Sequence, residues 1–377
     1  MFDADLVRGA LELERTEHGL RPHRLPAWAR AQTHDPQLHL VEAQPSGVRV
    51  AMHTDATSFE LDVLATKRRY AGAPVPPDGS YDVVADGVVV GQLHAEGGNI
   101  LHVDMMTGEG TLEPGEPTTL AFTVPAGSRT VEVWLPHDEQ TVLVDLRADG
   151  AVRPVTDERP VWLHHGSSIS HGSAATRPTG TWPAVAARLA DVALVNLGLG
   201  GSALLDPFVA RTIRDQPADL ISLKLGINVV NQDLMRRRAL RPAVHGFLDT
   251  IRDGHPETPL LLVSPILCPV HEDVPGPTAP DLEALGDGRL AFVAAGDPAE
   301  VAQGRLTLTA IREVLAGVVA ERDDPHLSYL DGRELYGEGD TGRLPLPDNL
   351  HPDPATHLLI GERFARLDWW GRAGRRG

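Results

Sequence analysis

The sequence predicts two parts: an all-β sandwich of jelly-roll type, then an α/β domain in which helices cover both faces of a parallel five-stranded sheet. Three observations support this. Apolar and polar residues alternate in short runs between residues 47 and 146, and strand-like runs alternate with helical patterns after residue 155. The 377 residues also exceed the size at which one hydrophobic core stops growing. We therefore place the domains at residues 1–155 and 156–377.

The first part reads as half-buried antiparallel strands. Asp86-Gly87 separates two of its apolar runs, and both positions of this dipeptide favour positive φ, which predicts a two-residue hairpin turn. Residues 1–45 precede the alternating region, with one short helix expected near residues 6–14. The alternation is carried by Val48, Val50, Met52, Phe59, Leu61, Val63, Val131, Val133, Leu135, Val142, Val144 and Leu146.

The second part alternates strand and helix patterns, which is typical of a parallel sheet between two helical layers. Pro242 is expected to bend or divide one long helix. Residues 268–300 are rich in Pro, Gly and acidic residues and are too long for a simple connection, so they are a candidate lid or binding loop. Strands are expected at 161–165, 192–197, 219–225, 259–263 and 327–330, and helices at 181–190, 232–252, 308–319 and 354–367.

Composition narrows the function. The 34 Lys and Arg against 52 Asp and Glu give a net charge of -18, which opposes binding to nucleic acid and to anionic membranes. The single cysteine, Cys268, excludes an intramolecular disulfide. The N-terminus is acidic and shows no apolar run of signal-peptide length, and no transmembrane run of about 18 apolar residues occurs. A cytoplasmic protein is expected.

The run V-W-L-H-H-G-S-S-I-S over residues 161–170 stops at Gly166 and presents Ser168 at the carboxyl edge of a strand. This edge is where ligands bind in open α/β sheets. A nucleophilic serine needs such a turn, because its oxygen must reach a substrate while the backbone behind it stays fixed. Taken alone, the pattern is weak, because most Gly-Ser-Ser tripeptides are ordinary turns.

Two further strand ends carry hydrogen-bond donors. The glycine-rich run N-L-G-L-G-G-S at 196–202 leaves backbone N–H groups open to an oxyanion, although a loose turn explains it equally well. A phosphate loop is excluded, because the run lacks the lysine of that motif. Asn228 in G-I-N supplies a side-chain amide, or else caps a helix.

Asp348 and His351 lie three residues apart in D-N-L-H-P. In one turn the carboxylate can accept the imidazole Nδ1–H, which fixes the tautomer and leaves Nε2 free as a general base. This is the Asp-His half of a Ser-His-Asp triad, while a polar turn before a helix is the plainer alternative. Together the four motifs favour a catalytic site.

The ordered set G-S-S-I-S, N-L-G-L-G-G, G-I-N and D-N-L-H resembles the four blocks of the SGNH hydrolases, or GDSL esterase/lipase family, over residues 160–367. The resemblance implies a flavodoxin-like sheet. It also implies that Ser168 is the nucleophile, that His351 is the base, and that Asp348 orients it. The oxyanion hole would consist of the backbone N–H groups of Ser168 and Gly201 and the Asn228 side chain.

Two positions depart from the family pattern. Ser167 stands where block one has Asp, and Val229 stands where an Asp often follows the Asn. Neither residue is the nucleophile or an oxyanion donor, so the chemistry is expected to survive. The two departures put in doubt the hydrogen bonding that steadies the nucleophile turn. An α/β-hydrolase is disfavoured, because Ser168 lies in G-x-S-x-S and the acid sits beside the histidine.

Five other residues near these strand ends attract attention. His164, His165 and His171 match no metal-ligand spacing and read as polar walls of the pocket, so no metal or cofactor is expected. Cys268 reads as a packed small residue rather than a nucleophile. Lys224 inside a strand is unusual and receives no role.

The residues therefore predict serine-dependent acyl transfer from an ester or thioester, with acyl-CoA as a possible co-substrate, to a hydroxyl acceptor or to water. The sandwich followed by a G-S-S block resembles salicylyl-type acyltransferases that modify aromatic polyketides such as tetracyclines. The sandwich also resembles a carbohydrate-binding module, so a carbohydrate acetyl esterase and a non-catalytic glycan-binding protein stay open as alternatives.

Overall fold

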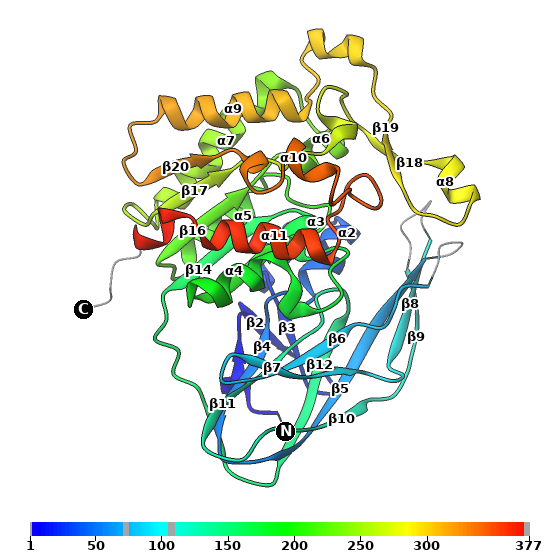
Figure 1. The fold of residues 1–377 in the computed structure, drawn as a ribbon, viewed down its shortest axis with the longest axis vertical. Helices are drawn as coiled ribbons and strands as arrows, with labels where there is room; N and C mark the ends of the chain where they lie inside the picture. The colour runs from blue at the N-terminus through cyan, green and yellow to red at the C-terminus, as the bar shows by residue number, and fades with distance from the viewer. Residues whose placement is uncertain (1, 71–74, 105–109, 373–377) are drawn as a thin grey trace. The chain divides into compact units, whose positions relative to one another are not determined.

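The structure, a computed structural model, describes residues 2–70, 75–104 and 110–372 (Figure 1). Residue contacts divide the chain into two compact units. The first comprises Met1–Arg159 and Thr176–Ala184, and the second Pro160–Ala175 and Val185–Gly377. The predicted fold class is confirmed: antiparallel β-sheets fill the first unit, and a parallel five-stranded sheet lies at the centre of the second.

The first unit is a sandwich whose two sheets share one apolar core, because every second residue of the central strands points inward. All strand pairs are antiparallel except β5 with β8. One sheet contains β1 (Val7–Arg8), β4 (Arg49–Thr54), β6 (Ser80–Ala85), β7 (Val88–His94), β11 (Arg129–Trp134) and β13 (Val152–Pro154). The other contains β2 (Glu12–Arg15), β3 (Leu20–His23), β5 (Ser58–Tyr70), β8 (Asn99–Val103), β9 (Gly110–Glu113), β10 (Thr118–Thr123) and β12 (Gln140–Ala148).

The start of the chain corrects one prediction and the hairpin confirms another. The helix expected near residues 6–14 is wrong: this stretch forms β1 and β2 after a short 3-10 helix η1 (Ala4–Leu6), because β2 pairs with β3. Asp86 and Gly87 have φ values of 47° and 78° and join β6 to β7, as predicted. The helical segments of this unit are α1 (Ala27–Arg30), α2 (Pro36–Glu42) and η2 (Pro178–Gly180).

The second unit has the parallel strand order β15-β14-β16-β17-β20. This order reverses beside β14, the point where ligands bind at the carboxyl edge of doubly wound sheets. The three central strands of this order are buried almost throughout, as helices on both faces of the sheet require. The strands are β14 (Val161–Gly166), β15 (Ala193–Gly198), β16 (Leu220–Lys224), β17 (Leu260–Val263) and β20 (Leu327–Leu330).

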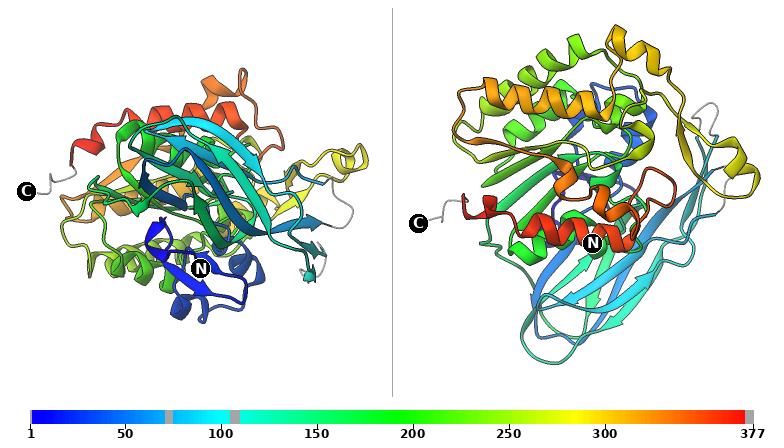
Figure 2. Two further views of the ribbon diagram at one scale, coloured as in Figure 1. Left: turned by 90° about the horizontal axis from the view of Figure 1, so that it is seen from below. Right: turned by 45° about the horizontal axis from the view of Figure 1, so that its top comes forward.

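Helices cover both faces of this sheet, with α9 and α11 on opposite sides (Figures 1 and 2). Side chains on the two faces of β14 contact helices of the two layers. Trp162 stacks on Phe364 of α11 with ring centroids 5.3 Å apart, whereas His165 stacks on Phe247 of α7 at 5.9 Å. The helices of the unit are α3 (Ser168–His171), α4 (Trp182–Ala190), α5 (Pro207–Asp215), α6 (Ile227–Asn231), α7 (Arg237–Arg252), α9 (Leu308–Glu321), α10 (Glu338–Thr341) and α11 (Pro354–Ala365), with 3-10 segments η5 (Gly332–Glu334) and η6 (Asp368–Arg372).

The helix expected at 232–252 begins later, at residue 237, and forms α7. The expected division at Pro242 is wrong, because α7 runs through this proline. This proline sits in the second turn, so it removes only the N–H that would reach the carbonyl of Arg238. No helix among the described residues is long and apolar enough to span a membrane.

The segment after β17 has secondary structure of its own. Residues 276–296, which we call the arm, contain the strand pair β18 (Thr278–Pro280) and β19 (Phe292–Ala294) with α8 (Leu282–Gly286) between them. Two 3-10 segments, η3 (Pro269–His271) and η4 (Pro298–Gln303), flank the arm.

Candidate active site

The turn that follows β14 holds Ser168 at the start of α3. Ser167 is extended at the N-cap, and Gly172 ends the helix with φ 114°. A Cβ on Gly198 would lie 2.4 Å from the His171 nitrogen, and one on Gly166 would lie 2.3 Å from Ser170 Oγ. Both glycines are therefore needed for α3 to pack directly against the sheet edge.

Ser168, His351 and Asp348 form one continuous chain of hydrogen bonds. The Ser168 hydroxyl lies 3.0 Å from His351 Nε2, and His351 Nδ1 lies 2.7 Å from Asp348 Oδ2. Ser168 and His351 are 183 residues apart in sequence. The structure thus brings together the three residues that the sequence singled out.

Asp348 fixes the loop as well as the imidazole. Its Oδ1 accepts the backbone N–H groups of Leu350 and His351, at 2.9 and 2.6 Å. Burial acts to raise the pKa of Asp348, but hydrogen bonds from the His351 ring and from these N–H groups outweigh it and keep the pKa below its usual range. The carboxylate therefore stays charged and orients the ring with Nε2 toward Ser168.

Asn228 and Gly201 follow β16 and β15, the two strands that flank β14. Asn228, in α6, is buried, and its Oδ1 accepts the Ala203 N–H at 3.1 Å. This bond directs the oxygen of the amide toward the glycine-rich turn and sets the orientation of the Nδ2 donor. Gly201 has φ 74°, and its carbonyl accepts the Gln232 side chain at 2.6 Å.

A series of hydrogen bonds between buried side chains supports the turn that carries Ser168. The Trp162 indole N–H donates to Ser222 Oγ at 2.8 Å, and His164 bridges Ser222 Oγ and Ser170 Oγ at 2.7 and 2.8 Å. Asn196 Nδ2 donates to the Ser170 carbonyl at 2.9 Å. Burial, and then the nearby His165 and Lys224, lower the pKa of His164 well below its usual value.

The histidines are interior residues rather than the polar walls we expected. His164, His165 and His171 are all at least 95% buried, and His165 Nδ1 donates to the Leu197 carbonyl at 2.8 Å. Within the described part of the chain, no group of three His, Cys, Asp or Glu side chains is arranged to hold a metal ion. Sequence reasoning missed the bridge made by His164, because its partner Ser222 is set by the register of β14 and β16.

Lys224 and Cys268 are both buried near this edge. Burial, and then Arg312, lower the pKa of Lys224 to about 8, and Nζ makes no hydrogen bond to the described residues. Burial raises the pKa of the Cys268 thiol to about 12, which leaves it protonated and unreactive. Its Sγ donates to the Asn349 carbonyl at 3.4 Å.

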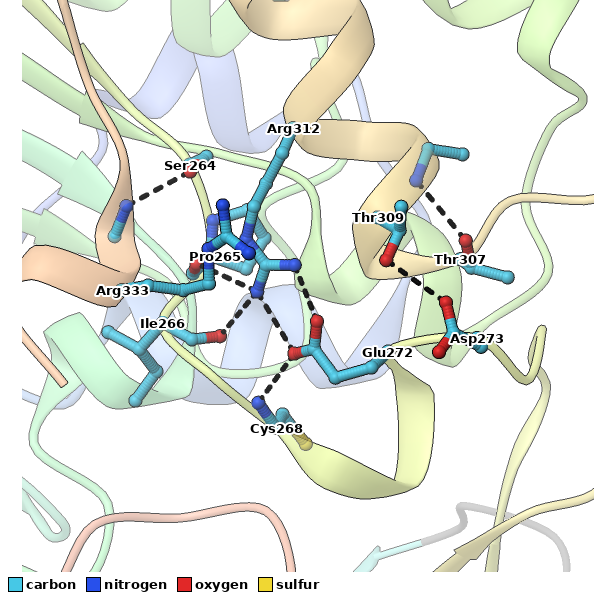
Figure 3. A network of polar contacts seen from close by, with 12 residues as sticks. Ser264, Pro265, Ile266, Cys268, Glu272, Asp273, Thr307, Thr309, Arg312 and Arg333 are labelled. Atoms are coloured by element: carbon cyan, nitrogen blue, oxygen red, sulfur yellow. Dashed lines mark hydrogen bonds and ion pairs between the residues drawn. The ribbon is translucent and has the colours of Figure 1, made fainter. Parts of the chain in front are cut away.

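A charged network fixes the loop that follows β17 (Figure 3). Arg312 of α9 pairs with both carboxylate oxygens of Glu272, at 2.6 and 3.0 Å, and donates to the carbonyls of Pro265 and Ile266. Glu272 also accepts the Cys268 N–H at 2.9 Å. The loop before the arm is therefore tied to α9 by a bidentate buried pair.

Phe292 contacts the histidine of the triad. Its ring meets the His351 ring edge to face, with centroids 5.9 Å apart and planes at 76°. Its N–H donates to the Asp348 carbonyl at 2.9 Å, and its carbonyl accepts Asn349 Nδ2 at 3.2 Å. The unusual length of the segment was the only sequence signal for this contact.

Comparisons with known proteins match both parts of the chain to family models. Residues 158–268 match the model of the GDSL-like Lipase/Acylhydrolase family. Residues 6–144 match the model named SsfX3, N-terminal domain. No curated protein sequence matches the chain.

Solved structures resemble the chain over most of its length. Salicylyl-acyltransferase SsfX3, from a tetracycline biosynthetic pathway, has a TM-score of 0.77 and 28% identity over 95% of this chain and 92% of that one. A protein described as a GDSL-like lipase from Bacteroides ovatus has a TM-score of 0.64 and 17% identity, over 95% and 93%. A family two carbohydrate esterase from Clostridium thermocellum has a TM-score of 0.56 and 13% identity, over 85% and 91%. The last two show the fold alone.

Proposed function

We propose that this protein is a serine acyltransferase that forms esters through a Ser168 acyl-enzyme. The observation that supports the proposal is the hydrogen-bonded chain of Ser168, His351 and Asp348. A serine is a weak nucleophile at its usual pKa, and a neutral imidazole held on its hydroxyl activates it. The resemblance to a salicylyl-acyltransferase favours transfer to an alcohol.

The proposed reaction has two halves. His351 Nε2 takes the Ser168 proton as Oγ bonds to the carbonyl carbon of an ester or thioester. The oxyanion is stabilised by the N–H groups of Ser168 and Gly201 and by Asn228, and loss of one such donor lowers the rate about 100-fold or more. The leaving alcohol or thiol departs with the proton from His351. An acceptor hydroxyl then gives its proton to His351 and attacks the acyl carbon, and His351 returns that proton to Ser168 Oγ as the bond between Oγ and the acyl carbon breaks.

The donor and the setting follow from the same proposal. We expect an acyl thioester such as acyl-CoA as donor, a small hydroxyl compound as acceptor, no bound cofactor and no nucleic-acid or membrane partner. Tailoring of an aromatic natural product suits this pairing. The cytoplasmic location expected from the sequence stays a prediction.

Intact-protein mass spectrometry tests the proposal. The protein is mixed with a panel of acyl-CoA thioesters and aryl esters, with Ser168→Ala as the inactive variant and Ser173→Ala as the matched control. An adduct on Ser168 that persists until an alcohol is added supports a transferase. Turnover of aryl esters without a lasting adduct or a thioester reaction points instead to an esterase, and acetylated sugars are then the substrates to try. Activity that survives Ser168→Ala refutes both.

A further inference from the structure

The arm is attached to the active site at its base and at Phe292. At the base, Glu272 is held by Arg312 and binds the Cys268 N–H (Figure 3). Cys268 Sγ in turn contacts the Asn349 carbonyl. Further along, the backbone of Phe292 exchanges hydrogen bonds with Asp348 and Asn349. The Phe292 ring is thus held in place beside His351.

The position beside His351 indicates which part of a substrate the ring would meet. In the proposed reaction, His351 passes the Ser168 proton to the leaving atom and later takes a proton from the acceptor. Leaving group and acceptor therefore lie on the His351 side of the acyl carbon. The carbonyl oxygen lies on the other side, toward Gly201 and Asn228. A ring packed on His351 consequently borders the leaving group and the acceptor, not the acyl chain.

The arm exposes apolar as well as charged side chains, and the side chain that it places against His351 is apolar. Its exposed large apolar side chains include Leu282, Leu285 and Leu290, which are 78%, 37% and 45% exposed. Sugar hydroxyls need a hydrogen-bond partner for each group removed from water, and the Phe292 ring supplies none. A flat apolar ring instead gains area and edge-to-face contacts on Phe292.

We propose that the arm forms the subsite for the leaving group and the acceptor, and that Phe292 makes this subsite selective for flat, apolar alcohols over sugars. The inference rests on the proposed function and adds the chemical class of the acceptor. It assigns the selectivity to one residue outside the four sequence motifs.

Two ester series separate this subsite from the acyl site. One keeps the acetyl group and compares 2-naphthyl acetate with vinyl acetate, and the other keeps 4-nitrophenol and compares acetyl with benzoyl. Phe292→Ala is expected to lower the naphthyl-to-vinyl ratio of kcat/KM about tenfold, because it removes one aromatic contact. The acetyl-to-benzoyl ratio is expected to change less than twofold. Phe292→Tyr is expected to keep the wild-type ratios.

The neighbouring Val293→Ala is the matched control, since successive residues of β19 point to opposite faces. Phe292→Leu, which keeps a large apolar side chain, guards against misfolding of the Ala variant, and thermal melts check both. An unchanged naphthyl-to-vinyl ratio, or an altered acetyl-to-benzoyl ratio, overturns the inference. So does a larger loss on acetylated xylose than on naphthyl acetate.

Labelling of Ser168 by a fluorophosphonate distinguishes failure of the subsite from failure of the proposed function. If the wild-type protein is labelled and turns over esters, but Phe292→Ala keeps its selectivity, only the subsite is refuted. If the wild-type protein is neither labelled nor active on any ester, the proposed function fails and the subsite fails with it.

Discussion

Replacing His164 is expected to remove a pH dependence from the stability of the second unit. The imidazole is fully buried between the hydroxyls of Ser222 and Ser170. Burial lowers its pKa well below the usual value, so it stays neutral in the folded protein. In the unfolded chain it takes up a proton below about pH 6.5.

The sign and the size follow from this difference. Below about pH 6.5 the unfolded chain binds one more proton than the folded protein, so the free energy of unfolding falls as pH falls. The contribution is fully present above about pH 6.5. It is lost toward the lowered pKa of the folded state, at about 1.4 kcal/mol per pH unit once the unfolded group is protonated. Between pH 6.5 and 4.5 the wild-type protein should therefore lose up to about 2 kcal/mol more of its free energy of unfolding than His164→Gln, whose amide offers a donor and an acceptor but does not titrate.

Urea unfolding followed by tryptophan fluorescence at pH 4.5, 5.5, 6.5 and 7.5 measures the effect. Trp162 reports locally, because its ring centroid lies 5.4 Å from that of His164. The exposed His34→Gln controls for the loss of an imidazole. Other buried groups such as His271 titrate in both proteins, so they cancel in the difference. Parallel stability curves for wild type and His164→Gln would show that His164 is not a neutral bridge.

Three other changes test the site. Lys224→Met is expected to raise the free energy of unfolding at pH 7 by about 1–3 kcal/mol. It is also expected to abolish the rise in wild-type stability between about pH 8 and 10.5, which arises because the lowered pKa of folded Lys224 lets the unfolded chain bind more protons there. Urea titrations at pH 7 and 10 measure both effects, and a less stable variant counts against the reasoning. Gly198→Ala is expected to destabilise the protein by about 1–3 kcal/mol and to slow fluorophosphonate labelling of Ser168, because its Cβ would press on the His171 backbone. As a control, Gly246→Ala in α7, which has open space around it, should stabilise the protein by about 0.5–1 kcal/mol. Asp348→Asn is expected to lower the acylation rate on the order of 10⁴-fold while leaving the fold intact, because an amide that donates to His351 Nδ1 favours the wrong tautomer of the imidazole. A stopped-flow burst with an aryl ester measures the acylation rate. A loss below about tenfold would exclude the orienting role of Asp348.

The sequence predicted the catalytic chain because parallel strands end at one edge of a sheet. Ser168 and Asn228 follow β14 and β16, which pair directly, so their meeting needs no knowledge of the loops. Asp348 and His351 lie within one turn, and their hydrogen bond is local. Motif and topology together were sufficient for these residues.

Contacts that depend on irregular or long-range pairing could not be predicted. Phe292 meets Asn349 across 57 residues, through a strand too short and too rich in turn residues to show a period. The false helix near residues 6–14 has the same origin, because β2 exists only by pairing with β3. Local preference does not reveal a partner strand that lies far away in the sequence.

The doubt raised by Ser167 can now be answered in physical terms. Ser167 is buried, and its hydroxyl makes no hydrogen bond to the described residues, so its side chain does not steady the nucleophile turn. Ser170 does so instead: its side chain binds His164, its carbonyl accepts Asn196 Nδ2, and the turn before it is closed by the Leu199 N–H on the Gly166 carbonyl. The hydrogen bonds that hold the turn are thus made by Ser170 and by residues of the sheet, not by the side chain at position 167. Because a neutral imidazole between two hydroxyls needs no counter-ion, it can hold the turn from within the core, where an unpaired carboxylate would be costly.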